Sequence, residues 1–166
     1  MSYNGHTYYI ILRKKSRVTE VLYNIGSESS VTTVLRLSGR NANKVFRDVI
    51  EALARQGATV PLRVSDSEQV YSVREDLGPV VGAYLILVRR ARSIEKWSRL
   101  FNELLDGRYA GVAKAFSAFF ELAIELSRTV PRMRRDGGYA ISPVVADALS
   151  SALKRFVDKV AKAYPE

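Results

Sequence analysis

The stretch Thr7–Lys14 reads TYYIILRK and joins aromatic and β-branched residues to two cations at its end. This composition is typical of a β-strand. Alternate side chains of a strand share a face, so the sequence places Tyr9, Ile11 and Arg13 on one face and Tyr8, Ile10 and Leu12 on the other. A second β-rich stretch, 18–25, follows the basic connection 15–17. Together the two stretches predict a hairpin, although no Asn-Gly turn joins them.

The residues that follow predict further strands around one helix. Residues 31–37 are rich in β-branched side chains and predict a third strand, and 42–56 predict a helix with an apolar stripe and a C-terminal Gly57. Residues 59–64 predict a strand that Pro61 restricts to a sheet edge.

Two stretches leave alternatives open. The Ser65–Glu68 pattern fits a capping box and favours a helix over 66–77, with a strand over 68–74 as the competing interpretation. Residues 80–90 are apolar on both faces and favour a central strand, although their apolar positions also fit a helical stripe.

The second half predicts three helices, over 93–105 with Ser93 as cap, over 109–129, and from Pro143 to about residue 163 with Ser142 as cap. The expected fold class is therefore α+β: a small, mostly antiparallel β-sheet with one or two helices, followed by a three-helix C-terminal part. We expect a basic domain over 1–92 and a helical region over 93–166, with one integrated domain as the alternative.

The charge of the 166-residue chain is unevenly distributed. Its 26 Lys plus Arg and 17 Asp plus Glu give a net charge of +9, and 47% of its residues are hydrophobic. Cations minus anions give 6 − 2 = +4 over residues 1–40, 8 − 6 = +2 over 41–92, 5 − 5 = 0 over 93–130 and 7 − 4 = +3 over 131–166. The excess charge therefore lies on the predicted strands and on the last section of the chain.

Several functional classes lose support from the sequence. The absence of cysteine excludes a disulfide scaffold, a Cys-ligated metal and thiol catalysis, and His6 is the only histidine. Neither phosphate-binding glycine motif occurs. We therefore expect no enzyme, no metal and no cofactor. No apolar run is long enough to span a bilayer, and the first residues lack a basic segment followed by an apolar core, which favours a cytoplasmic protein without membrane contact. The Arg-rich, Cys-free composition is compatible with a thermophile.

The remaining signal is a mixture of tyrosines and cations on predicted strands. Single-stranded nucleic acid suits this mixture, because bases stack on aromatic rings and cations contact phosphates. The alternative is that the tyrosines belong to the core and the cations to a solvated rim. The candidate nucleic-acid-binding residues are Tyr9, Arg13, Lys14, Lys15, Arg17, Tyr23, Arg36, Arg40, Lys44, Arg47, Tyr84, Arg89, Arg90 and Arg92.

The helix over 109–129 is apolar over more than a narrow stripe, with Phe116 and Phe120 among its side chains. It is either the central helix of a bundle or a surface for self-association. We expect a homodimer or homotetramer formed through the C-terminal helices.

The strands over 7–14 and 18–25, the Ser38-Gly39-Arg40 entry to the first helix and the C-terminal helices resemble the crenarchaeal single-stranded DNA-binding protein family ThermoDBP and its related proteins. The resemblance implies an N-terminal DNA-binding domain and a helical part that drives oligomerisation. Residues 143–163 lack the Leu heptad of that family's zipper-like helix, which favours a bundle-type assembly. The expected function is sequence-tolerant binding of single-stranded DNA, with RNA as a further ligand to test. The alternatives are a small subunit of an archaeal CRISPR surveillance complex and a non-enzymatic protein-assembly module.

Overall fold

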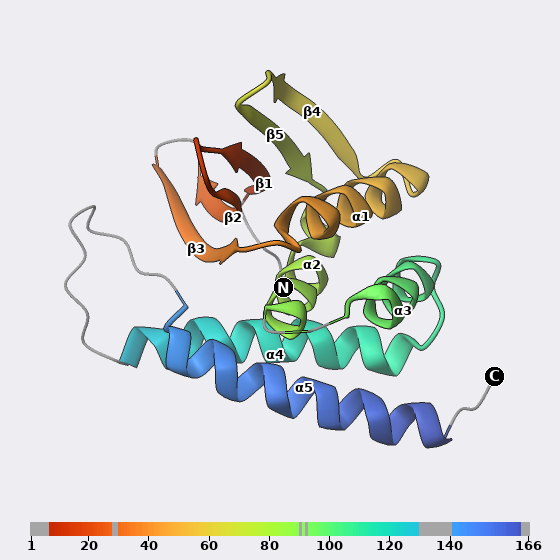
Figure 1. The fold of residues 1–166 in the computed structure, drawn as a ribbon. Coiled ribbons are helices and arrows are strands. Elements are labelled where there is room, and N and C mark those ends of the chain that lie inside the picture. Colours follow the sequence, from red (N-terminus) through yellow and green to blue (C-terminus); the bar gives the residue numbers. More distant parts are fainter. Residues whose placement is uncertain (1–6, 28–29, 90, 92, 130–140, 164–166) are drawn as a thin grey trace. The chain divides into compact units, whose positions relative to one another are not determined.

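A computed structural model describes residues 7–27, 30–89, 91, 93–129 and 141–163 (Figure 1). Within these residues, one five-stranded antiparallel sheet and five α-helices give the α+β class that the sequence predicts. The elements are β1 (Thr7–Lys14), β2 (Thr19–Ser27), β3 (Ser30–Ser38), α1 (Ala42–Arg55), β4 (Thr59–Val64), β5 (Glu68–Val73), the short 3₁₀ helix η1 (Glu75–Leu77), α2 (Gly78–Val88), α3 (Glu95–Leu105), α4 (Ala110–Thr129) and α5 (Pro143–Ala163).

The sheet has the strand order β3-β2-β1-β5-β4, and all neighbouring strands are antiparallel. The strongly apolar β1 lies at its centre. The N–H of Lys15 donates to the carbonyl of Val18 at 2.8 Å and closes the predicted β1–β2 hairpin without an Asn-Gly turn. β4 is an edge strand, as Pro61 predicts, because proline has no N–H to donate to a further strand.

The helix predicted over 66–77 is wrong, and the competing strand is right. Ser65 Oγ accepts a hydrogen bond from the N–H of Glu68 at 3.1 Å, which is the first bond of a capping box, but it closes the β4–β5 turn instead. Beyond the turn, β5 pairs with β1, and Tyr71 stands opposite Ile10. The pairing with β1 decides the outcome, because the local bond fits either structure.

Helix α1 ends as predicted. Gly57 has a φ of +63°, the N–H of Gly57 donates to Ala54 at 3.0 Å, and the N–H of Ala58 donates to Leu53 at 2.9 Å. These two bonds form a Schellman motif, in which glycine is favoured at the left-handed position. The motif ends α1 and leads the chain directly into β4.

The strand predicted over 80–90 is wrong, because these residues belong mainly to helix α2. Every residue of α2 is buried. The Tyr84 ring stacks on Phe101 of α3 with centroids 4.4 Å apart, and a Cβ on Gly82 would lie 2.2 Å from the ring of Phe120 in α4. A helix enclosed on all sides has no polar stripe. Its sequence therefore lacks the helical periodicity of apolar and polar side chains that distinguishes an amphipathic helix from a buried strand.

The helical part confirms the three predicted C-terminal helices. α4 and α5 lie side by side and run in opposite directions (Figure 1). α5 begins at Pro143, and the Ser142 carbonyl accepts from the N–H of Ala146 at 2.8 Å. α3 begins after Ile94, so Ser93 is not its cap. The described residues form two compact units that divide after Gly78, whereas the predicted domains divide after residue 92.

Candidate nucleic-acid interface

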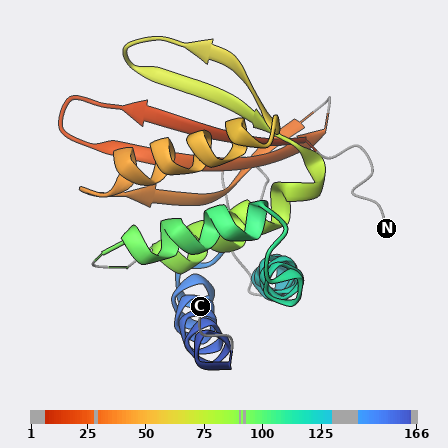
Figure 2. The same cartoon turned by 90° about the vertical axis from the view of Figure 1, so that its right-hand side faces the viewer.

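The two faces of the sheet have different surroundings. One face, called the first face here, packs against α1, as Figure 2 shows. Phe46 of α1 meets the Tyr71 ring edge-on, with centroids 5.7 Å apart. The β1 side chains Tyr8, Ile10 and Leu12, which the sequence places together, are all buried and share this face with Tyr71. The first face is therefore a core surface.

Tyr23 belongs to this core, so its predicted role in nucleic-acid stacking is wrong. It stands opposite Ile10, has an exposed fraction of 0% and stacks on Tyr8 at 5.9 Å. Its hydroxyl donates to the carbonyl of Gly78 at 2.7 Å. Burial, with a smaller contribution from Tyr8, raises the pKa of Tyr23 well above its usual value. The sequence missed this because a tyrosine whose hydroxyl finds a partner is as suitable for a core as for a binding surface.

The opposite side of the sheet, called the second face here, carries the predicted group of Tyr9, Ile11 and Arg13. The register arranges it in three rows across the strands, which we name after their central residues. The Arg13 row contains Ser38, Glu20, Arg13 and Glu68; the Ile11 row contains Arg36, Leu22, Ile11, Val70 and Arg63; the Tyr9 row contains Thr33, Asn24, Tyr9, Ser72 and Val60. Ile11 and Leu22 are buried, whereas Tyr9 and Arg13 are partly exposed. One of the three candidate tyrosines therefore lies on the second face.

Glu68 connects two arginines on the second face. Arg13 donates to its Oε2 from Nε at 3.2 Å and from Nη2 at 3.1 Å, and Arg63 donates to its Oε1 from Nη1 at 3.0 Å. These hydrogen bonds, from Arg63 first and Arg13 second, lower the pKa of Glu68. The carboxylate stays charged at neutral pH and holds both guanidinium groups in place.

Glu20 connects a second pair of cations. Lys15 Nζ lies 3.5 Å from its Oε1, and Arg36 Nε lies 3.7 Å from its Oε2. Glu20 has an exposed fraction of 5%, and within the described residues its Oε1 accepts no hydrogen bond. Burial of a carboxylate requires nearby positive charge, which these two cations supply. Lys15 and Arg36, distant in sequence, therefore converge on the second face.

Arg63 is a site residue that sequence reasoning missed. Simple alternation from Val60 would place Arg63 on the first face. The β4–β5 register shifts between Pro61 and Arg63, so Leu62 is an extra residue and Arg63 stands opposite Val70 on the second face. A β-bulge reverses the facing of the residues beyond it, and the sequence contains no clear signal for this one.

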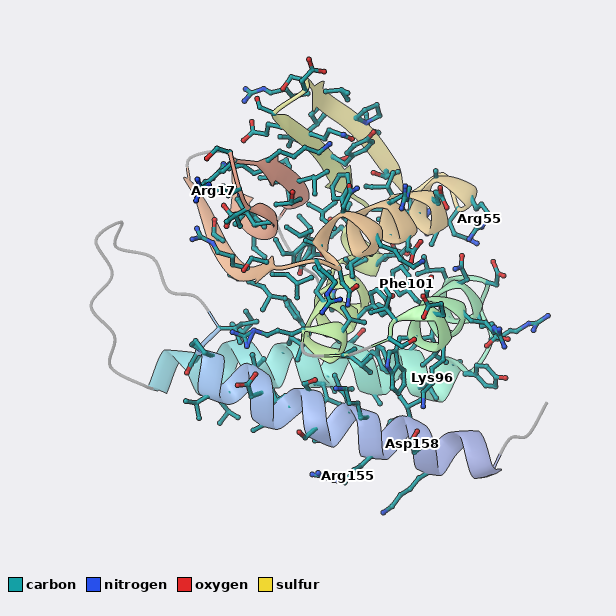
Figure 3. All side chains as sticks on the ribbon, in the orientation of Figure 1. Arg17, Arg55, Lys96, Phe101, Arg155 and Asp158 are labelled. Carbon is teal, nitrogen blue, oxygen red and sulfur yellow. The ribbon has the colours of Figure 1, made fainter. Side chains whose placement is uncertain are left out.

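Four predicted cations, with Lys15 among them, lie at or near one end of the sheet, called the turn end here, where the β1–β2 and β4–β5 connections meet. The N–H of Lys14 donates to the carbonyl of Ser67 at 2.8 Å and joins the two connections. Arg17 lies in the β1–β2 connection (Figure 3), and Arg40 follows β3 at the same end, because Ser38 pairs with Glu20. Lys14, Lys15, Arg17 and Arg40 are all exposed. The pairing of β3 with β2 therefore brings Arg40 to the end of the sheet at which Lys14, Lys15 and Arg17 lie.

Two predicted cations lie on α1 beyond the turn end. Lys44 Nζ is 3.2 Å from Asp48 Oδ2, one helical turn away, and Arg47 is exposed. The Lys44–Asp48 pair compensates much of the Lys44 charge locally. Lys44 is therefore a weaker candidate for phosphate contact than Arg47.

Of the four candidates in or beyond α2, the structure describes two, Tyr84 and Arg89. Tyr84 is buried against Phe101, so its predicted role in stacking is wrong. Arg89 donates to Asp147 of α5 at 2.9 Å and is partly buried, which indicates a structural ion pair within the helical unit. Arg90 and Arg92 lie outside the described residues, as does His6.

In the described part of the chain, no three acidic or histidine side chains come together as a group that could hold a metal ion. The described helices include none whose length and hydropathy together would suffice to cross a bilayer.

Comparison with known proteins adds no relative: no family model, no curated protein and no solved structure matches the chain.

Proposed function

We propose that this protein binds single-stranded DNA in a sequence-tolerant way, as a non-enzymatic cytoplasmic protein that acts as a homo-oligomer. The observation that carries the proposal is the gathering of cations along the turn end and the second face. Lys14, Lys15 and Arg17 come from the end of β1 and the turn after it, and Arg36 and Arg40 come from β3 and the segment after it, yet the two groups occupy neighbouring positions.

This arrangement favours contact with phosphates. The exposed cations supply positive charge, and the arginines add the forked donors that match phosphate oxygens. Binding of this kind releases counterions and depends little on base sequence. The expected affinity therefore falls steeply as salt concentration rises.

The preference for a single strand rests on Tyr9. Its ring is partly exposed on the second face beside Asn24 and Ser72, and an unpaired base can stack on it. Bases in a duplex already stack on one another and are not available to a flat protein surface. Because Tyr23 and Tyr84 are buried, stacking contributes at one tyrosine position and phosphate contacts contribute most of the affinity.

Fluorescence anisotropy with labelled poly-dT, the matching duplex and poly-U over a series of salt concentrations tests this proposal. We expect tighter binding of poly-dT than of duplex and a linear decrease of the logarithm of affinity with the logarithm of salt. Equal affinity for single strand and duplex would contradict the proposal. The poly-U arm decides whether RNA is also bound.

The homo-oligomer part of the proposal is supported by α4. Phe116 and Phe120, the expected association residues, have exposed fractions of 0% and 2% and belong to the core of the helical unit. Leu122 and Leu126 are instead exposed, at 44% and 40%, and lie one turn apart. Two large apolar side chains adjacent on a helix surface favour contact with another protein surface, here a second copy of the chain.

A further inference from the structure

We infer that the bound strand crosses the second face at right angles to the β-strands, from Arg36 on edge strand β3 to Arg63 on edge strand β4. This inference rests on the proposed function and adds the path of the strand and Arg63 as a binding residue. Arg36 and Arg63 are the two ends of the Ile11 row, which includes one residue from each of the five strands.

The dimensions suit a short length of nucleic acid. Four spacings of about 4.8 Å between neighbouring strands separate the two arginines by about 19 Å at their backbones. At about 3.4 Å per stacked nucleotide, that width accommodates at most about six nucleotides. The side chains of Arg36 and Arg63 are 58% and 70% exposed, so both can reach a ligand on this face.

The cations along this path are already held in place. Arg13 and Arg63 meet at the carboxylate of Glu68, and Lys15 and Arg36 meet at that of Glu20. Four cations and two carboxylates leave a local charge of 4 − 2 = +2. The carboxylates orient the cations before binding, which reduces the conformational entropy lost when phosphates contact the donors that remain on the same side chains.

The rows also indicate which side of the path receives the bases. The Arg13 row lies toward the turn end, where Lys14 and Arg17 add positive charge, and the Tyr9 row lies on the other side of the Ile11 row. Val70 and Tyr9 are partly exposed and offer apolar and aromatic contact. The phosphates therefore lie between the Ile11 row and the Arg13 row, where Arg36, Arg13 and Arg63 stand, and the bases lie over Val70 and Tyr9.

Disulfide trapping tests the path directly, because the chain has no cysteine of its own. Single variants Thr33→Cys and Val60→Cys place a thiol at the β3 and β4 ends of the Tyr9 row, and Ala54→Cys on the exposed side of α1 is the control. Oligo-dT with one thiol-bearing base is the probe. We expect trapping at both second-face positions, with preferred tether positions several nucleotides apart, and only background trapping at Ala54→Cys.

The variant Arg63→Gln supplies an independent measurement, with Arg55→Gln on α1 as a charge-matched control. We expect Arg63→Gln to reduce the salt slope of poly-dT binding by about 0.7 and Arg55→Gln to leave it unchanged. If the wild type binds poly-dT but Arg63→Gln behaves like Arg55→Gln and Val60→Cys is not trapped, the path is wrong and the proposed function stands. If the wild type shows no preference for poly-dT over duplex, the proposed function itself fails.

Discussion

Neutralising the turn end gives the sharpest test of electrostatic binding. The triple variant Lys14→Gln, Arg17→Gln and Arg40→Gln removes three exposed cations that belong to the turn end. Each phosphate neutralised on a single strand contributes about 0.7 to the slope of log affinity against log salt, so the variant should lose about 2 from that slope. The circular dichroism spectrum should not change, because the three side chains are exposed.

A charge-matched control separates local contact from overall charge. Arg55→Gln, Arg99→Gln and Arg155→Gln change exposed residues on α1, α3 and α5, and both triple variants have a net charge of 9 − 3 = +6. Figure 3 shows Arg55 and Arg155, with Arg17 for comparison.

The assay is anisotropy with poly-dT between about 0.05 M and about 0.2 M salt, a range of about 0.6 logarithmic units. When the salt concentration rises over that range, a slope difference of about 2 reduces the ratio of the wild-type affinity to the variant affinity by a factor of about 20. The control triple should retain the wild-type slope. Equal slopes for the two triple variants would refute the reasoning, because the loss would then reflect net charge and not the turn end.

Two further predictions concern the helical unit. Gly82→Ala should lower the unfolding midpoint, because the added Cβ would lie 2.2 Å from the buried Phe120 ring. Overpacking of this kind costs about 1–3 kcal/mol, which exceeds the gain of about 1 kcal/mol from the higher helix propensity of alanine. Gly111→Ala in α4, where a Cβ meets nothing within 4 Å, should not destabilise the protein, and equal midpoints for the two variants would contradict this packing. Leu122→Gln with Leu126→Gln should reduce the mass measured by light scattering without loss of helix content, and an unchanged mass would exclude this surface as the association interface.

The sequence predicts best where a local pattern and a tertiary requirement coincide. The β1 stretch alternates between a core side and a cationic side, and its neighbours on both sides confirm that alternation in their register. Gly57 and Pro143 are read correctly because a left-handed residue and a first-turn proline act through the backbone alone. The predictions at Gly57 and Pro143 depend on few residues and on no distant contact.

The wrong predictions share a different cause: each depends on which distant element packs against the residue. Tyr23 is buried because α1 and Tyr8 lie on the same face of the sheet. All residues of α2 are buried, so no polar stripe marks it as a helix. Arg63 reaches the second face only through the extra residue Leu62. The same bulge places Arg63 within 3.0 Å of Glu68, so the residue that alternation would assign to the first face completes the line of cations across the second. Burial of two of the three candidate tyrosines removes most of the predicted stacking, while this line of cations strengthens the predicted phosphate contact. The salt slope measures that second contribution, because it counts the phosphates that the cations neutralise.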